Sequence, residues 1–446
     1  MENSFVIWYL NNIFVPKKRI LMKIIQTFWS GGLSLRENAF GWLHPEYNLM
    51  SWALSCLTLR RHGYEVSLYT DQMGKEWLIN RIGLPYTEVF PIYNESLCLP
   101  KHWACAKIKT YSLQQEPFIH IDGDVFIPKK LPDVFENAKL ITQNREYGAN
   151  HYRIMMDNFV NHPNAVVPVY LFKRWNATSI PSYNMGVFGG RDLEFIHYYC
   201  CQAEKLLLMN HINDRFDSRS HLDMNVIFEQ MLFAALADEK GRKPKSILPQ
   251  NIKDTGYSAS EFCDFCRWNR LQLLHIIGGN KRVESICQAM ERKLFLDYPE
   301  YYIRIASLFP ERHACIGSEY ENEVVKQERR YCMSQTFFAD DLRKWDNLVL
   351  AKNPFLTHLT YACMREKWVY YIPSVLSKNG HCMSVGPLGK NILTLLEDEF
   401  MTYESLCSAL KSVVFSSCEG QTQDWIDEEL GYLLQHGAIT INNINP

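Results

Sequence analysis

The chain has 446 residues, of which 47% are apolar and 22% charged, and its formal net charge is −2. This length predicts two or three domains, each with enough apolar residues to bury a core. The near-neutral charge excludes a generally basic nucleic-acid binder and a polybasic membrane-surface protein, and ordinary proline and glycine contents exclude collagen-like and low-complexity chains.

Residues 1–21 are expected to be a short extension before the first domain. The apolar run 5–10 is interrupted by Asn11, and the basic PKKR follows it, which is the reverse of a secretory signal. A membrane-spanning helix needs about 20 apolar residues. We therefore expect a cytoplasmic protein without a transmembrane segment, and a weak membrane association through this extension stays open.

From Met22 onward, apolar strands alternate with amphipathic helices, which predicts a mostly parallel sheet covered by helices on both faces. Ligands of such sheets bind beyond the carboxyl ends of the strands, so residues that follow a strand are the first candidates for a site. The expected strands are 23–29, 64–70, 116–121 and 271–277, and the expected helices are 45–63, 75–83, 101–115 and 221–237.

The segment FIHIDGDVFI (118–127) places Asp122 and Asp124 around Gly123 at the end of an apolar strand. Two carboxylates one residue apart present hard oxygen ligands near one point, which suits a divalent cation that bridges them to a diphosphate. The glycine would let a bulky anion approach the backbone. A polar turn that ends a strand is the alternative.

The segment HIIGGNK contains His275, Gly278 and Lys281 in HxxGxxK spacing. The imidazole could complete a site made by two aspartates, the glycine could admit a phosphate, and the lysine could neutralise it. A histidine on a short apolar strand is otherwise a core residue, and this alternative stays open.

The segment SYNMGVFGG (182–190) combines a polar side chain with several glycines. Asn184 can hydrogen-bond sugar hydroxyls, while Gly186 and the pair Gly189-Gly190 allow close approach to the backbone. A tight strand-turn segment would explain the same residues without any ligand.

In this order and within one alternating segment, the three motifs resemble the nucleotide-sugar glycosyltransferases of GT-A architecture, in particular the group of glycogenin and the bacterial lipooligosaccharide galactosyltransferases. Residues 22–284 also resemble an uncharacterised family of bacterial proteins that shares QTFWSG, WACAKIKTYSL and HIDGDVFI. The resemblance implies a Rossmann-like, mostly parallel sheet between helices. It also implies a metal-dependent transfer of a hexose from a nucleotide sugar, with UDP as the nucleotide and retention at the anomeric carbon.

Carried over to this sequence, the pattern of the group assigns three sets of residues. Asp122, Asp124 and His275 would bind Mn²⁺ or Mg²⁺, and Gly278 and Lys281 would hold the β-phosphate of UDP. The residues expected to face the donor nucleotide are Thr27, Phe28 and Trp29 after the first strand, Asp71 after the second strand, and Gly186.

The pattern also includes a basic residue near the aspartates and a polar group near the anomeric carbon. Lys107 matches the basic position, and Lys109 is the competing choice. The usual acidic D-Q-D before the last histidine is absent, and FEQMLF offers Glu229 and Gln230 instead. The candidate catalytic residues are Lys107, Asn184, Glu229 and Gln230. Because Glu229 and Gln230 could also be polar positions on a core helix, the carboxylate that faces the anomeric carbon stays open.

The C-terminal part of the sequence predicts a small α+β unit over 366–446. Helices are expected at 387–399, 402–414 and 422–437, followed by the strand AITI, an order typical of a winged helix. Four lysines without arginine stand against ten acidic residues, a balance of −6 that makes this unit a poor DNA binder. It resembles the PqqD-type modules that dock peptides on a sheet edge for enzymes modifying ribosomal peptides. Generic packing of three helices is the alternative.

The sequence thus predicts a glycosyltransferase domain at 22–284, a helical linker region at 285–365 and a peptide-binding module at 366–446. The fourteen cysteines form no compact framework and are expected to be free thiols. Two acceptors stay open: a precursor peptide held by the C-terminal module, and a polysaccharide or lipooligosaccharide of the cell surface. A non-catalytic peptide-binding scaffold on a degenerate transferase fold is a third alternative.

Overall fold

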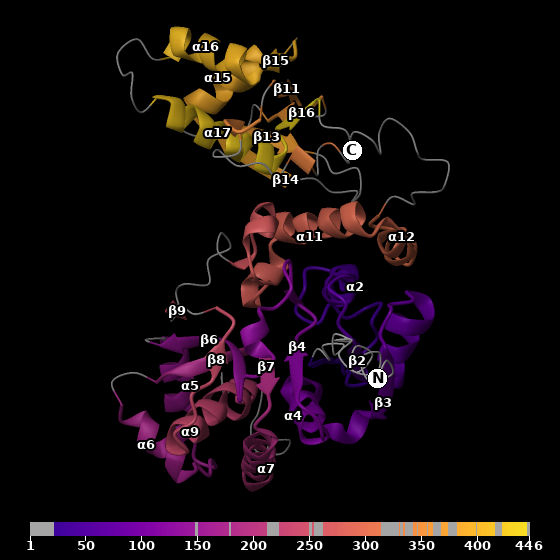
Figure 1. Cartoon of the computed structure of the whole chain (residues 1–446), viewed down its shortest axis with the longest axis vertical. Coiled ribbons are helices and arrows are strands. Elements are labelled where there is room, and N and C mark those ends of the chain that lie inside the picture. Colours follow the sequence, from indigo (N-terminus) through magenta and orange to yellow (C-terminus); the bar gives the residue numbers. More distant parts are fainter. Residues whose placement is uncertain are drawn as a thin grey trace, which may run out of the picture.

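The fold was analysed in a computed structural model of the chain (Figure 1). The described residues are 22–147, 150–177, 180–211, 223–248, 252–253, 262–313, 330, 333–334, 342–345, 347–354, 356–359, 367–372, 381–397, 399–414 and 422–443. The N-terminal extension 1–21 and its apolar run lie outside these residues. In the described part of the chain, no helix is both long enough and apolar enough to cross a membrane.

An eight-stranded, mostly parallel sheet organises the larger part of the molecule. Its order is β3-β2-β1-β4-β7-β6-β8, and β9 also pairs with β6. β7 is antiparallel to both of its neighbours, and the other pairs of this sheet are parallel. The strands are β1 (Lys23–Thr27), β2 (Val66–Asp71), β3 (Glu88–Tyr93), β4 (Phe118–Ile121), β6 (Ile141–Tyr147), β7 (Ser182–Gly190), β8 (Lys245–Ser246) and β9 (Ile252–Lys253).

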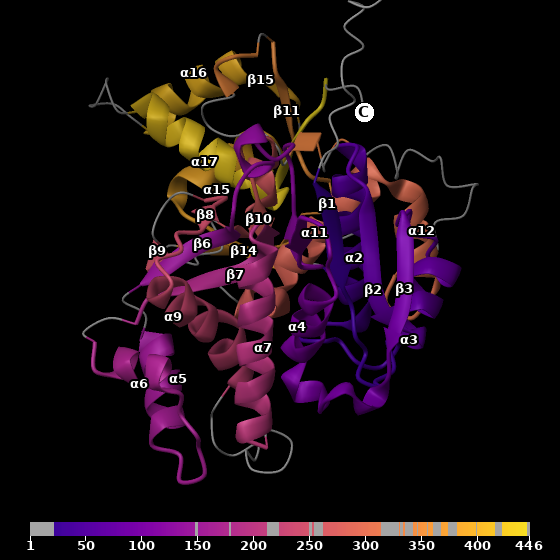
Figure 2. The same ribbon diagram turned by 60° about the horizontal axis from the view of Figure 1, so that its bottom comes forward.

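Helices cover both faces of this sheet, as the alternation predicts. Neighbouring residues of β1 point to opposite faces: Ile25 packs among α4, α7 and α9, and Ile24 packs beneath the other face with Val66. Figure 2 shows α4 and α7 together in front of the sheet. The helices of this part are α2 (Pro45–Arg61), α3 (Gln72–Gly74), α4 (Ala104–Ser112), α5 (Asn150–Val160), α6 (Val169–Trp175), α7 (Leu193–Met209) and α9 (Leu232–Glu239), with π-helical turns η1 (Lys75–Arg81) and η5 (Val226–Met231) and 3₁₀ turns η2 (Glu95–Leu97), η3 (Pro100–His102), η4 (Asp133–Phe135), η7 (Phe265–Arg270) and η8 (Gly278–Arg282).

Two positions of β7 require glycine because the neighbouring backbone approaches them closely. Gly189 and Gly190 have φ values of +152° and +132°, and a Cβ on them would lie 2.1 Å from the carbonyl oxygen of Phe118 and 2.2 Å from that of Lys139. The close backbone approach that the sequence predicts for this pair is therefore an approach of protein backbone within the sheet.

The large unit extends past residue 284. α11 (Glu284–Asp297) and α12 (Pro299–Ser307) pack against α2 in one apolar cluster that also contains Trp52 and Leu68. The helical prediction for 285–365 thus holds for its first part, and these two helices belong to the face of the sheet that α2 covers. Farther along, two strands appear in the region predicted as a helical linker: β11 (Val349–Lys352) and β12 (Thr357–His358).

The C-terminal unit lies beyond α11 from the sheet, in yellow in Figure 1. β11 pairs with β15 (Met401–Thr402) and β16 (Ile439–Ile441), so this unit includes residues upstream of 366. β12 pairs with β13 (Trp368–Ile372), which pairs with β14 (His381–Val385). Its three helices have an apolar core in common and lie close to the predicted positions: α15 (Pro387–Leu395), α16 (Tyr403–Val414) and α17 (Thr422–His436).

Candidate functional site

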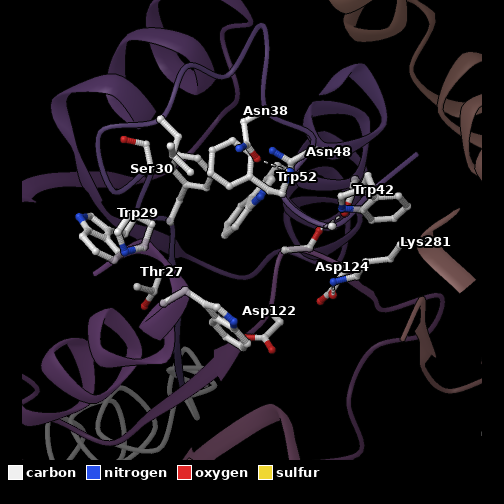
Figure 3. A pocket seen from close by; sticks show the side chains of 18 of the residues that line it. Thr27, Trp29, Ser30, Asn38, Trp42, Asn48, Trp52, Asp122, Asp124 and Lys281 are labelled. Carbon is white, nitrogen blue, oxygen red and sulfur yellow. Dashed lines mark hydrogen bonds and ion pairs between the residues drawn. The ribbon is translucent and has the colours of Figure 1, made fainter. Parts of the chain in front are cut away.

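A pocket of about 760 Å³ opens where β1 and β4 end (Figure 3). Thr27 and Trp29 follow β1, and Asp122 and Asp124 follow β4. Its walls come from five chain segments that the fold brings together, with lining residues within 27–33, 38–52, 100–107, 122–124 and 278–282. The pocket therefore lies at the edge of the parallel strands where ligands of such sheets bind.

Helix α2 holds the Asp-Gly-Asp turn in place. The Ser51 hydroxyl donates a hydrogen bond of 2.5 Å to the carbonyl oxygen of Gly123, and the Ser55 hydroxyl donates one of 2.7 Å to that of Val125. A Cβ on Gly123 would lie 2.4 Å from the indole ring of Trp52. The glycine between the aspartates is thus required because Trp52 packs on it, which differs from the sequence-based expectation that it admits an anion.

A short strand carries His275 to the same turn. β10 (Leu274–His275) pairs antiparallel with β5 (Val125–Phe126), and His275 is the partner of Val125. As a result His275 Nε2 lies 3.4 Å from Asp124 Oδ1. On the other side of the ring, Nδ1 donates a hydrogen bond of 2.7 Å to Gln143 Oε1. A ring nitrogen fixed in this way sets the orientation of the imidazole and leaves Nε2 facing the carboxylate.

Gly186 lies directly beneath this histidine. A Cβ at position 186 would be 2.6 Å from Gln143 Oε1 and 2.7 Å from His275 Cε1. Asn184 accepts a hydrogen bond of 2.9 Å from the Gly186 amide through its side-chain oxygen. In the structure Gly186 therefore makes room for the imidazole, and Asn184 shapes the strand at this point.

Lys281 reaches Asp124 from the loop after β10. Its Nζ lies 2.5 Å from Asp124 Oδ2 and 5.8 Å from the ring centroid of Trp42. Burial would raise the pKa of Asp124, but Lys281 and His275 outweigh it and hold the pKa well below its usual range. Gly278 has a φ of +55° with open space around its Cβ direction, so the loop turns here without a side chain over the pocket.

Lys107 is a buried lysine between two carboxylates. Its side chain is only 4% exposed, and Nζ lies 2.9 Å from Asp122 Oδ1 and also pairs with Glu229. Burial alone would lower the pKa of Lys107, but Asp122 and Glu229 raise it, so the ammonium is retained. Burial raises the pKa of Asp122 to about 6, with Asp124 adding to the shift and Lys107 opposing it.

The structure distinguishes between the two lysines that the sequence left open. Lys107 lines the pocket, whereas Lys109, on the same helix, is exposed to solvent. Glu229 is 1% exposed in the π-helical turn η5, where it faces Lys107. Gln230, the next residue, instead accepts a hydrogen bond of 2.8 Å from the Tyr152 hydroxyl. Of this pair, Glu229 is thus the one connected to the aspartates.

Side chains of the types that bind divalent cations lie at the turn or beside it. Carboxylate oxygens and an imidazole nitrogen are ligands that Mn²⁺ accepts, and the orientation of His275 by Gln143 is typical of a metal-binding histidine. His275 and Asp124 are close together, whereas Asp122 pairs with Lys107. Within the part of the chain that the structure describes, no group of three or more His, Cys, Asp or Glu side chains is already arranged around one metal position.

Asp71 has a different position from the predicted one. It lies outside the pocket lining among the described residues, and its carboxylate accepts hydrogen bonds of 2.7 Å from the Ser30 amide, 2.6 Å from the Ser30 hydroxyl and 2.7 Å from the Gly74 amide. Asp71 thereby caps α3 and fixes the loop after β1. Thr27, Phe28 and Trp29, in contrast, do line the pocket.

Several lining residues were missed by the sequence analysis. They include aromatic and amide side chains in the loop after β1 and on α2, and no motif marks them. One signal for the residues on α2 was present. This helix is buried almost throughout, and its polar residues Asn48, Ser51 and Ser55 recur every three to four positions, which places them on one face. The missed lining residues are Ser30, Leu33, Asn38, Phe40, Gly41, Trp42, Asn48, Ser51, Trp52, Pro100, Lys101, Trp103, Ala106, Gly279 and Arg282.

The predicted CxxC is only partly described. Cys263 is a buried free cysteine, and its thiol lies 3.6 Å from the carbonyl oxygen of His275. The side chain of Cys266 lies outside the described residues.

These features define a mixed α/β protein with a large, mostly parallel sheet flanked by helices and a polar pocket at the strand ends. The chain belongs to a family of unknown function, DUF6734, which matches residues 22–308. This range ends just after α12, in agreement with the packing of α11 and α12 against α2.

The chain was also compared with curated proteins and with solved structures. No curated protein matches the chain. Among solved structures, the chain has a likeness to the glycosyltransferase GlyE of Streptococcus pneumoniae TIGR4, with 11% identity and a TM-score of 0.30. This match covers 65% of the present chain and 64% of the GlyE chain.

Proposed function

We propose that the protein is a glycosyltransferase that moves a hexose from a nucleotide sugar, with a UDP-sugar as the favoured donor. The observation that carries this proposal is the convergence of Lys107, Lys281 and His275 on the Asp-Gly-Asp turn at the strand ends. A pocket with paired carboxylates, fixed cations and aromatic walls suits a ligand that combines a diphosphate with ring systems.

The charge of the inner cluster supports a divalent cation in this proposal. Three carboxylates, Asp122, Asp124 and Glu229, are in contact with only two lysines, Lys107 and Lys281. Lys101 and Arg282 also line the pocket, and a divalent cation at the turn would add to the positive charge that a diphosphate meets beside these carboxylates. Asp122, Asp124 and His275 would hold Mn²⁺ or Mg²⁺, which when bound would neutralise the diphosphate and polarise its oxygens.

Side chains of the protein would bind the phosphate and the nucleoside and would orient the aspartates. Lys281 would bind the β-phosphate and stabilise the charge that develops as the C1–O bond to UDP breaks, and Gly278 would leave room for that phosphate. Thr27, Phe28 and Trp29 would contact the nucleoside. Lys107 and Glu229 would keep Asp122 oriented. Retention at the anomeric carbon is proposed from the resemblance described above.

For the acceptor we propose a ribosomal peptide docked on the C-terminal unit, which would act as a winged-helix-like, PqqD-type module. In its three-stranded sheet β14 is an edge strand among the described residues, and Ser384 and Cys382 alternate outward with buried Met383 and Val385. An edge of this kind can accept an added peptide strand. Binding of such a peptide is expected to protect the backbone amides of β14 from hydrogen exchange. A bound peptide that leaves these amides unprotected would contradict the docking.

Thermal unfolding in the presence of nucleotide sugars tests the enzymatic proposal. We expect UDP and at least one UDP-hexose, each with Mn²⁺, to raise the melting temperature, because a ligand that binds only the folded state stabilises it. Addition of EDTA should remove most of this stabilisation. ADP, GDP and GDP-mannose serve as comparison ligands. A flat response to the entire panel would contradict the proposal and favour a non-catalytic scaffold.

A further inference from the structure

The buried end of the pocket beside Lys281 is walled by aromatic side chains. Trp42 and Trp52 are 5% and 8% exposed, and the Trp42 ring centroid lies 5.8 Å from Lys281 Nζ. Phe28 packs edge to face against Trp52 and Phe40, with ring centroids 5.2 and 5.8 Å apart. These rings give one end of the pocket flat apolar walls next to a fixed cation.

One polar side chain in this end lacks a hydrogen-bond partner. Asn48 lies in the first turn of α2, lines the pocket and is only 3% exposed. Its Nδ2 has no hydrogen-bond partner in the described part of the chain. A buried donor that stays unpaired destabilises a folded protein, and one that lines a pocket can be paired by an acceptor atom of a ligand.

The position of Asn48 relative to the turn is fixed. It precedes Ser51 and Trp52 by about one turn of the same helix, and these two residues hold and cover Gly123. In Figure 3 Asn48, Trp52 and Trp42 lie on the side of the pocket away from Thr27. The unpaired amide therefore lies in a different part of the pocket from Thr27 and Trp29, whereas Phe28, which packs on Trp52, lies between the two parts.

We propose that Asn48, Trp42 and Trp52 bind the hexose ring of the donor, an inference that rests on the proposed function. The C–H face of a pyranose packs on an aromatic ring, and a ring hydroxyl would accept the hydrogen bond that Asn48 Nδ2 can donate. The hexose is bonded to the β-phosphate, which the proposed function places at Lys281, the neighbour of Trp42. Trp103, which also lines the pocket, is 48% exposed, and we place the acceptor on its side.

The variant Asn48→Leu tests this inference, because leucine has a similar size and no hydrogen-bond donor. Dissociation constants are measured by calorimetry with Mn²⁺ for UDP, UDP-glucose, UDP-galactose, UDP-N-acetylglucosamine, GDP and GDP-mannose. For the nucleotide sugar that the wild type binds most tightly, we expect about tenfold weaker binding. The parent nucleotide should bind the variant within twofold of the wild type. Without ligand, the variant should melt at the same or a higher temperature, since the unpaired donor is gone.

The exposed Asn80 of η1 provides the matched control, and Asn80→Leu should change none of these constants. An equal loss for the nucleotide and its sugar derivative would place the nucleoside at Asn48 and overturn the inference. Unchanged binding of both would also overturn it. A lower melting temperature without a sugar-specific change would show a purely structural role and contradict the inference. If no nucleotide binds the wild type, the proposed function itself fails, and the hexose site fails with it.

Discussion

Asp124→Asn should lower the rate of donor hydrolysis, measured as UDP released from the preferred UDP-hexose, by about a thousandfold. The substitution keeps the shape of the side chain and removes the charge that faces both Lys281 and His275. Without that charge, Lys281 loses its fixed position and the proposed cation loses one carboxylate ligand. Donor hydrolysis is the suitable assay because it does not require the acceptor.

A matched control for this experiment is Glu116→Gln, which removes an exposed acid just before β4. Its hydrolysis rate should equal that of the wild type, and circular dichroism should show both variants folded. If Asp124→Asn retained more than a tenth of the wild-type rate, Asp124 would not belong to the reacting centre.

Lys107→Met should lower the free energy of unfolding by about 3–5 kcal/mol, measured by urea denaturation. The reason is that Asp122 and Glu229, which is 1% exposed, would face each other without the ammonium that now separates them. Removing one member of a buried ion cluster leaves an uncompensated charge, which is far more costly than the loss of a surface pair.

Two further variants separate charge from packing. Lys109→Met, on the exposed side of the same helix, should change the free energy of unfolding by less than about 0.5 kcal/mol. Adding Glu229→Gln to Lys107→Met should recover part of the lost stability, because only one buried carboxylate then stays unpaired. A Lys107→Met protein within about 1 kcal/mol of the wild type would contradict the description of this cluster.

The sheet and its helices were predictable from the sequence because their signals are local. The apolar runs around Ile24 and Ile119 and the periodic apolar positions of 45–63 reflect burial against immediate neighbours, and the structure confirms a mostly parallel sheet with helices on both faces. The ends of some elements differ from the predicted ends by a few residues. The strand predicted at 271–277, for example, is limited to Leu274–His275 because its pairing with β5 is short.

Long-range contacts were not predictable in the same way. Gly123 and Gly186 stood out in the sequence, but the side chains that require them, Trp52 and His275, are distant along the chain. Asp71 follows a strand as a ligand-binding residue would, yet it caps α3. The strand β11 was hidden in a region without a clear pattern, because its partners β15 and β16 come more than 40 residues later.

Crystals of the protein grown with UDP and MnCl₂ would test the central claim most directly. Anomalous diffraction locates Mn²⁺ independently of the protein. We predict an anomalous peak in contact with Asp124 and the Nε2 atom of His275, with the diphosphate between this peak and Lys281. Bound UDP without a cation at the Asp-Gly-Asp turn, or a nucleotide outside this pocket, would contradict the account.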